Sequence, residues 1–210
     1  MQMRWIEEIL MPRRCVFCDT RCKPFEVHIC ENCLSDLPWN RFACQADVLP
    51  FAAIVAPLEY SFPVDAALKS LKFKRRLDYV PAFAELLRRM FSQLPSDIDA
   101  LLPVPLHWRR QALRGFNQAV ELCEPIRKQT GLPVLTCINR VKPTPKQSNL
   151  DAAERRRNLQ NAFVATGPIE LRHVLIVDDV ITTGETCQQL AKVVLAAGAE
   201  KVSVLAVARA

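Results

Sequence analysis

Glycine is scarce in this sequence, with only five among 210 residues, at positions 115, 131, 167, 184 and 198. No two of them lie two residues apart, which excludes the Gly-x-Gly-x-x-Gly fingerprint of dinucleotide-binding folds. None is followed by Lys-Ser or Lys-Thr, which excludes the phosphate-binding P-loop. Two common ways of binding a nucleotide are therefore absent.

Long apolar runs are also missing. No run approaches the ~18 residues that a membrane-spanning helix needs, so we expect no membrane insertion. Residues 1–11 lack the long apolar centre of a secretory signal peptide. They contain Glu7 and Glu8, and their pattern predicts a short amphipathic helix. We therefore expect a cytoplasmic protein.

Cysteine, in contrast, is abundant, and five of the nine cysteines fall between residues 15 and 33. Without an export signal, such a cluster favours metal binding over disulfides. Two Cys-x-x-Cys knuckles can converge on one Zn²⁺, and four thiolates would close a structural site. The ligands would be Cys15, Cys18, Cys30 and Cys33. The alternative is a set of reduced cysteines without metal. We interpret Cys22 as a free thiol or substitute ligand, and His28 as a loop or capping residue.

The net charge of +6 is unevenly distributed along the chain. Residues 109–161 hold eleven Lys and Arg against four Asp and Glu, a balance of +7, whereas residues 1–40 hold five against six. Zinc ribbons that bind nucleic acid usually carry a basic excess, which this cysteine-rich segment lacks. A structural or partner-docking role is therefore the better prediction for it.

Strand-like and helix-like segments alternate through the rest of the chain. The apolar patterns predict strands at 52–58, 100–104, 134–138, 162–165, 174–177 and 201–208. They predict helices at 64–73, 81–94, 119–129, 151–160 and 186–197, with a connector at 34–47. Such alternation implies an α/β fold with a mostly parallel sheet, whose ligands bind at the carboxyl ends of the strands.

The most informative stretch runs from His173 to Thr186. A short apolar run predicts a buried strand, and Asp178 and Asp179 stand where that strand should end. The following Thr-Thr-Gly turn opens a helix, whose unpaired N–H groups can hold a phosphate. Carboxylates suit hydroxyl donors or Mg²⁺ instead. A ligand with both a phosphate and a vicinal diol is a ribose 5-phosphate. The alternative is an acidic strand end followed by an ordinary helix cap.

Two basic segments could complete such a site. Arg109, Arg110 and Arg114 follow another predicted strand end, where guanidinium groups would match pyrophosphate oxygens; the alternative is a solvated basic loop. The segment 142–148, which contains Lys146 and two prolines, predicts a lid that closes over the ligand, or else a surface connector. A third cluster, 72–76, ends a predicted helix, where cations are favourable without any ligand. The alternative is that it faces the substrate cleft.

The order of these features resembles the ComF family of the type I phosphoribosyltransferase superfamily. The resemblance rests on the four-cysteine segment, on Arg114-Gly-Phe-Asn-Gln118, on Gln147 with Arg155-x-x-Asn158, and on Val177-Asp-Asp-Val-Ile-Thr-Thr-Gly184. It implies a zinc-ribbon module at 1–45 and a phosphoribosyltransferase domain at 46–210. It also implies binding of phosphoribosyl pyrophosphate (PRPP) with Mg²⁺, and a role in the uptake or processing of transforming DNA.

By this resemblance, Asp178 and Asp179 would hold the ribose hydroxyls, and Arg114 and Lys146 would assist the departing pyrophosphate. The PRPP-binding residues would be Asp178, Asp179, Val180, Thr182, Thr183, Gly184, Glu185, Thr186, Arg109 and Arg110. Relatives that use oxopurines have an aspartate where this chain has Thr182, so hypoxanthine and guanine are not favoured as acceptors. The acceptor, turnover and oligomeric state are not indicated by the sequence.

A binding protein without turnover is the rival hypothesis. It would sense PRPP, bind single-stranded DNA through the basic middle segment, or dock on a helicase or other DNA-processing partner. Trp108 and Phe116 are the few aromatic residues of that segment that could stack on bases. A purely structural zinc adaptor would leave the acidic motif unexplained.

Overall fold

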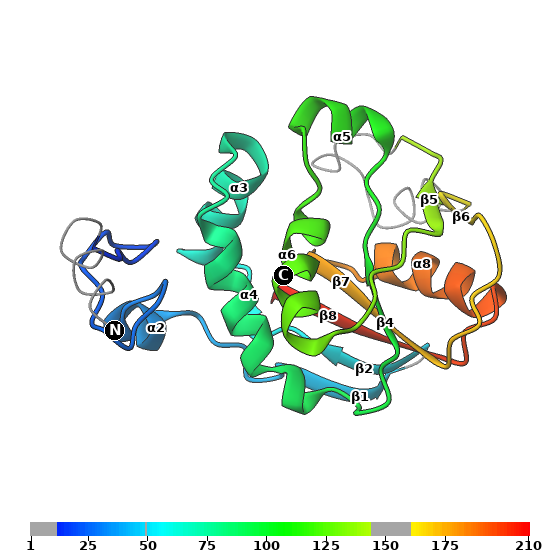
Figure 1. Cartoon of the computed structure of the whole chain (residues 1–210), viewed down its shortest axis with the longest axis horizontal. Coiled ribbons are helices and arrows are strands. Elements are labelled where there is room, and N and C mark those ends of the chain that lie inside the picture. Colours follow the sequence, from blue (N-terminus) through cyan, green and yellow to red (C-terminus); the bar gives the residue numbers. More distant parts are fainter. Residues whose placement is uncertain (1–11, 49, 144–160) are drawn as a thin grey trace.

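A six-stranded, mostly parallel sheet with helices on both faces organises this computed structural model, which describes residues 12–48, 50–143 and 161–210 (Figure 1). The main path of the sheet is β1 (Cys44–Val48), β2 (Phe51–Val55), β8 (Lys201–Arg209), β7 (His173–Ile181) and β4 (Ala100–Pro103). Strand β3 (Leu58–Glu59) also pairs with β8. Only the β1–β2 pair is antiparallel in this sheet. A separate antiparallel pair consists of β5 (Ile138–Arg140) and β6 (Phe163–Ala165).

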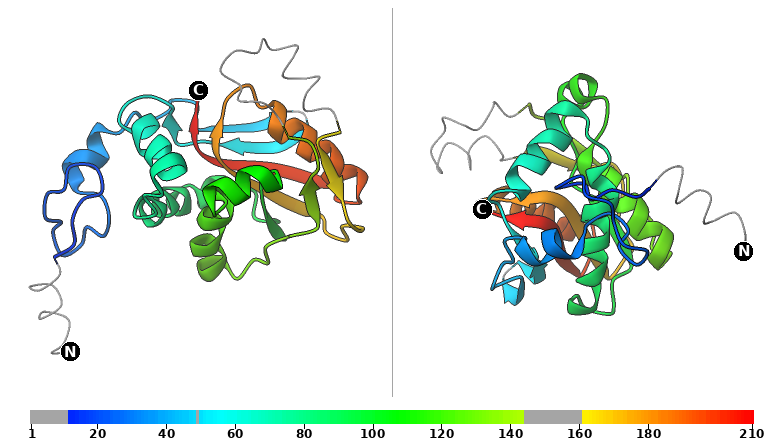
Figure 2. Two further views of the ribbon diagram at one scale, coloured as in Figure 1. Left: turned by 90° about the horizontal axis from the view of Figure 1, so that it is seen from above. Right: turned by 90° about the vertical axis from the view of Figure 1, so that its left-hand side faces the viewer.

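The helices form a layer on each side of the sheet (Figures 1 and 2). One layer contains α3 (Val64–Lys74), α4 (Tyr79–Arg89) and α6 (Gln118–Thr130), and a 3₁₀ turn, η1 (Phe91–Gln93), follows α4. The other layer contains α8 (Glu185–Ala196). Two shorter helices are α2 (Glu31–Asp36) near the N-terminus and α5 (Trp108–Arg114) between β4 and α6.

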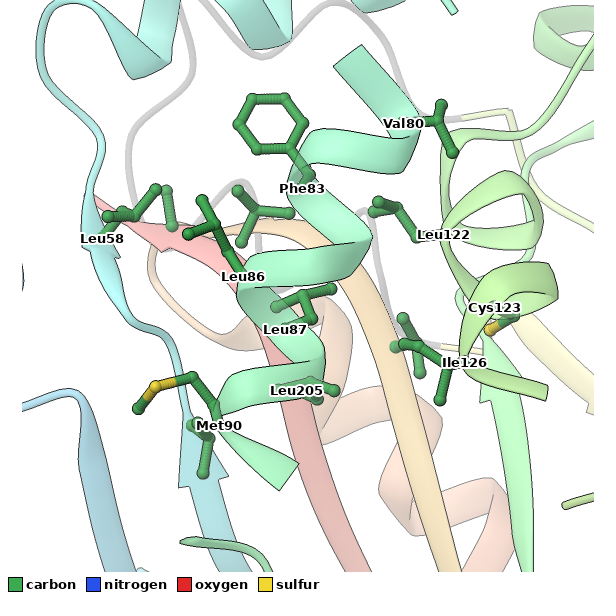
Figure 3. Close-up of a cluster of buried hydrophobic side chains, with 14 of the residues drawn as sticks. Leu58, Val80, Phe83, Leu86, Leu87, Met90, Leu122, Cys123, Ile126 and Leu205 are labelled. Atoms are coloured by element: carbon green, nitrogen blue, oxygen red, sulfur yellow. The ribbon is translucent and has the colours of Figure 1, made fainter. Parts of the chain in front are cut away.

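Two hydrophobic cores, one on each face, hold these layers together. Alternate residues of β7 serve the two faces: Leu175 and Val177 pack toward α4 and α6, while Val174 and Ile176 pack toward α8. All four are fully buried, as expected for a central strand of a parallel sheet. Figure 3 shows the first core, in which Phe83 and its neighbours on α4 face side chains of α6 and β8.

The structure corrects four expectations about the elements. Strand β7 continues four residues past Val177, because β8 remains paired with it as far as Ile181. The basic segment after β4 is a helix, α5, rather than a loop. The supposed connector at 34–47 contains the end of α2 and most of β1. The strand expected at 134–138 is reduced to a single bridge between Val134 and Leu101, and β5 begins only at Ile138.

Several predicted features lie outside the described residues. These are the amphipathic helix at 1–11, the lid residues from 144 onward with Lys146, and the helix at 151–160. Within the parts of the chain that the structure describes, no helix is long and apolar enough to cross a membrane.

The cysteine-rich segment lies at one end of the molecule, beside α3 and α4 (Figure 2). It contacts the larger part through an aromatic cluster, in which the ring of Phe17 lies 5.8 Å from that of Tyr79 and 6.4 Å from that of Phe83. Leu37, at the end of α2, is buried in the same core as these α4 residues. The segment is therefore packed onto the α4 side of the fold.

A buried polar cluster connects the amino ends of β7 and β8. It lies at the opposite end of these strands from the acidic pair. Nδ1 of the fully buried His173 lies 2.8 Å from Oδ1 of Asp97, and Nε2 lies 2.8 Å from Oγ of Ser203. Lys201 also pairs with Asp97, at 2.9 Å. The order Asp-His-Ser resembles a hydrolase triad, but Ser203 is itself fully buried and cannot meet a substrate. The cluster is therefore structural.

We expect His173→Ala to lower the free energy of unfolding by about 2–4 kcal/mol, because it leaves a cavity and removes one partner of Asp97 and the partner of the buried Ser203 hydroxyl. Urea denaturation followed by circular dichroism measures the change. The matched control is Arg172→Ala, since that neighbouring side chain is 72% exposed and lies 3.5 Å from Glu200. An equal effect of the two substitutions would contradict the structural role of His173.

Candidate functional site

A cavity of about 220 Å³ opens at the carboxyl ends of β4 and β7. Its walls come from α3, from the loop after β4 with α5 and the start of α6, from β5, and from the end of β7 with the turn into α8. Its lining residues are Tyr60, Lys72, Val104, Leu106, Arg110, Arg114, Asn117, Gln118, Arg140, Asp178, Asp179, Val180, Thr182 and Thr186. Segments that lie far apart in the sequence thus meet at the edge where parallel sheets usually bind ligands.

The acidic pair stands inside the last part of β7 rather than after it. Asp179 is buried and forms an ion pair with Lys72 of α3. The Asp178 carboxylate accepts a hydrogen bond of 2.8 Å from the backbone N–H of Asp179. Burial, together with the neighbouring Asp179 charge, raises the pKa of Asp178 to about 8. The two carboxyl groups therefore differ: Asp179 has a cationic partner, while Asp178 is held in an environment that favours its protonated form.

The hydroxyl-bearing turn after β7 contributes only part of its predicted residues to the cavity. Thr182 and Thr186 line it. Thr183 is exposed, and Gly184 adopts a left-handed backbone (φ +77°) directly before the first residue of α8. Glu185 is buried at the start of that helix. The turn therefore presents hydroxyl groups and the amino end of α8 beside the acidic pair.

The three arginines of α5 separate into two groups. Arg110 and Arg114 line the cavity, and burial lowers the pKa of each guanidinium. Arg109 is exposed, and its guanidinium lies 5.2 Å from the ring centre of Trp108. The helical periodicity of α5 explains this, because residues 110 and 114 share a face that residue 109 does not. The structure thus brings two of the predicted arginines to the acidic pair.

The Arg-Gly-Phe-Asn-Gln run joins α5 to α6. Gly115 ends α5 in the left-handed region, at φ +78°. Asn117 caps α6 by accepting the N–H of Ala119 at 3.0 Å, and it donates to the carbonyl of Val104 at 3.0 Å. Gln118 accepts a hydrogen bond of 3.0 Å from Arg114. The motif thereby fixes the start of α6 against the end of β4 and holds Arg114 over the cavity.

Three of the seven cavity residues outside the predicted site come from parts of the chain before β4 or after α6. Tyr60 follows β3, Lys72 lies on α3, and the largely buried Arg140 lies on β5, where burial lowers its pKa to about 10. The sequence contains some indication of Lys72, because this residue begins the basic cluster at the end of α3. The sequence contains no indication of Arg140, because its position depends on the pairing of β5 with β6. Strands of three residues are too short to predict from the sequence. These cations increase the positive charge of the cavity.

The four predicted zinc ligands are brought together near the N-terminus. The sulfur atoms of Cys15, Cys18, Cys30 and Cys33 all lie within 4.8 Å of one another, which is a spacing that one metal ion can bridge. Hydrogen bonds to Thr20 are the main cause that lowers the pKa of Cys18 to about 6, so this thiol is largely a thiolate at neutral pH. Cys22 and His28 lie outside this group. The donor set fits a structural zinc ion.

Because its pKa is raised, Asp178 is expected to make the ligand-free protein less stable as the pH increases. Between about pH 4 and pH 8 the folded state holds a proton that the unfolded state has lost, so stability falls with pH across this window. Asp178→Asn removes this slope. Thermal denaturation with a chelator that does not remove zinc should show equal stability near pH 4 and an advantage for the variant on the order of 2 kcal/mol at pH 8, since the carboxyl faces an open cavity.

The matched control for that comparison is Asp36→Asn, which changes an exposed aspartate in α2. It should leave the pH dependence of stability unchanged. A wild-type stability that rises from pH 4 to pH 8 relative to Asp178→Asn would contradict the raised pKa.

Fold and site together define an α/β protein with a mostly parallel sheet, flanking helices, a polar cavity at the strand ends and a four-cysteine cluster. No protein-family model matches the chain. DNA utilization protein YhgH of Escherichia coli O157:H7 is 37% identical over 189 residues, which cover 83% of this chain and 79% of that protein. Competence protein F of Haemophilus influenzae is 33% identical over 204 residues, 93% of this chain and 84% of that protein. The chain belongs to the ComF family.

Two solved structures are similar at lower levels. One is described as the allosteric regulatory enzyme of purine biosynthesis, with a TM-score of 0.39, 19% identity, and coverage of 60% of this chain and 25% of that one. The other is adenine phosphoribosyltransferase from Leishmania tarentolae, with a TM-score of 0.35, 18% identity, and coverage of 71% and 74%.

Proposed function

We propose that this protein binds PRPP with Mg²⁺ in the cavity at the strand ends and transfers the phosphoribosyl group to an acceptor. One observation carries the proposal: a single cavity is lined by the acidic pair, by the hydroxyl turn and by Arg110 and Arg114. A ribose with phosphates at both ends requires these three chemistries within one small volume. The proposal also takes residues 1–45 as a zinc module, 46–210 as the transferase domain, and the cytoplasm as the location.

The proposed roles follow from charge and reach. Asp178 and Asp179 accept hydrogen bonds from the ribose hydroxyls, and the Thr182–Thr186 turn holds the 5-phosphate. Arg110 and Arg114 face the pyrophosphate. As the bond from ribose C1 to pyrophosphate breaks, its electron pair leaves with the pyrophosphate, and these arginines stabilise the charge that develops there. The acceptor forms the new bond to C1 and gives up its proton.

Mg²⁺ would supply further positive charge to the phosphate oxygens when it binds with PRPP. The site fits an ion that arrives with its ligand, because carboxylates are suitable partners but Asp179 already pairs with Lys72. Positioning and electrostatics would account for most of the catalysis. Lys146, outside the described residues, keeps its proposed place on the lid.

A role in handling single-stranded DNA is the second candidate. The relatives are called DNA utilization and competence proteins. Phe73 on α3 and Trp108 on α5 are 68% and 65% exposed, and each has an arginine over its ring. Exposed aromatic residues beside cations are the usual platform for unpaired bases. DNA binding that weakens with salt and persists in Asp178→Asn would favour this candidate.

Two measurements test the proposed transferase. Calorimetry with PRPP and Mg²⁺ should show binding at one site per chain, and ribose 5-phosphate should compete for it. Pyrophosphate release from PRPP should then be screened over acceptors that include free bases and DNA ends. An absence of PRPP binding by folded, zinc-loaded protein would refute the proposal, whereas binding without release would favour the sensing protein over the enzyme.

A further inference from the structure

The ion pair between Lys72 and Asp179 joins α3 to the acidic pair. Both side chains are largely shielded, with 20% of Lys72 and 10% of Asp179 exposed. The Coulomb attraction between such shielded charges is stronger than at the surface, because solvent screens it less. In the ligand-free protein, a cation from the protein itself therefore already stands at the carboxylate that a ligand would use.

Helix α3 is held in position over this carboxylate by contacts with α5. Arg75, at the end of α3, donates a hydrogen bond of 2.8 Å from Nε to the carbonyl of Arg114. The guanidinium of Arg114 lies 5.4 Å from the ring centre of Phe73. A Cβ atom at Gly115 would lie 1.7 Å from Nη2 of Arg75, so glycine leaves room for this contact. The ends of α3 and α5 are thus joined, and Lys72 is aimed into the cavity.

The charges around the acidic pair oppose the binding of a bare metal ion. Lys72 pairs with Asp179 and neutralises its charge. Arg110, Arg114 and Arg140 line the same cavity. A divalent ion that approaches without phosphates would meet a cation at the carboxylate and three guanidinium groups nearby, and the Coulomb energy between like charges at a few ångströms is large. An anionic ligand reverses this balance.

We propose that Lys72 takes the place of a divalent cation at the acidic pair of the ligand-free protein, so that metal enters this site only together with the phosphate-bearing ligand. The inference deepens the proposed function, on which it rests for the identity of that ligand. Lys72 is then a residue that sets the order of binding, because its charge keeps free metal away from the carboxylate. The negative charge of the ligand's phosphates allows the metal ion and Lys72 to occupy the same site.

The test is titration of the full-length, zinc-loaded protein with Mn²⁺, with free Mn²⁺ followed by electron paramagnetic resonance. We expect weak binding by the wild type and at least about tenfold tighter binding by Lys72→Gln, because one positive charge next to the metal is removed. The matched control is Lys69→Gln on the same helix, since Lys69 is 57% exposed and pairs with Asp65 at 2.6 Å. Adding Asp179→Asn to Lys72→Gln should return Mn²⁺ binding to the wild-type level.

Equal Mn²⁺ affinities of the wild type and of Lys72→Gln would overturn the inference, provided that circular dichroism shows both to be folded. Lys72→Met keeps the aliphatic stem and serves if the glutamine variant is unstable. Calorimetry with PRPP and Mg²⁺ on the same proteins separates the two proposals. If the wild type does not bind PRPP, the proposed function fails, while the Mn²⁺ titration still decides the role of Lys72.

Discussion

Replacing Arg110 and Arg114 together by glutamine is expected to weaken PRPP binding at least about 100-fold, because each guanidinium would lose charge-assisted hydrogen bonds to phosphate oxygens worth about 1.5–3 kcal/mol. Both side chains line the cavity beside the acidic pair. Glutamine keeps much of the side-chain length, so the change removes charge more than shape. Calorimetry with PRPP and Mg²⁺ at fixed ionic strength measures the loss.

The neighbouring Arg109 provides a matched control on the same helix. It is exposed and rests on the ring of Trp108 rather than lining the cavity. Arg109→Gln removes the same charge one residue away and should change the affinity less than about threefold, through long-range attraction alone. If all three arginines proved equally important, a diffuse basic surface, as in the DNA-binding candidate, would explain the data better than a defined pyrophosphate site.

Loss of the zinc ion proposed for the four-cysteine cluster is the second change with a large expected effect. Cys15→Ser should abolish binding of one equivalent of zinc per chain, because three thiolates cannot close the tetrahedral site, and a small segment of this kind hardly folds without its ion. Cys15 is also almost completely buried. Elemental analysis of the purified protein measures zinc, and limited proteolysis should show cleavage within residues 12–43 in the variant only.

Cys22→Ser tests whether the effect belongs to the quartet. Cys22 lies in the same segment but outside the group of four sulfur atoms, so this variant should keep its zinc and its resistance to protease. Loss of zinc from Cys22→Ser would mean that this residue is a ligand. An undiminished zinc content in Cys15→Ser would show that the cluster does not require four thiolates.

The elements of the sheet could be predicted because their signals are local. The apolar runs of β7 and β8 are long enough to indicate buried strands, and α8 has a clear amphipathic pattern. Strand β1 was missed although its five residues alternate between apolar and polar side chains, because one short edge strand gives only a weak signal. Helix α5 was missed because three arginines among its seven residues are equally typical of a basic loop. The folded chain decides such cases by tertiary contacts, here between Arg114, Phe73 and Arg75.

The parts of the site that lie within a single sequence motif could be predicted. The acidic pair, the hydroxyl turn and the cysteine quartet each lie within a short stretch, and parallel strands bring their ends together. The contribution of Lys72 depends on the orientation of α3 relative to β7, and that of Arg140 depends on the antiparallel pairing of the short strands β5 and β6. Neither relation leaves a trace in residue spacing. That Arg109 points away from the cavity could likewise be predicted only if α5 were known to be a helix.

The aromatic contact of Phe17 with Tyr79 and Phe83 has a consequence for how this chain can be divided. Tyr79 is the first residue of α4, and the turn 75–78 connects it to the end of α3, where Lys72 lies. A truncated protein that begins at residue 46 would leave this aromatic surface uncovered and would also lose Leu37 from the core. Such a fragment is expected to aggregate on expression unless polar residues replace the uncovered surface, so the two parts are best produced as one polypeptide.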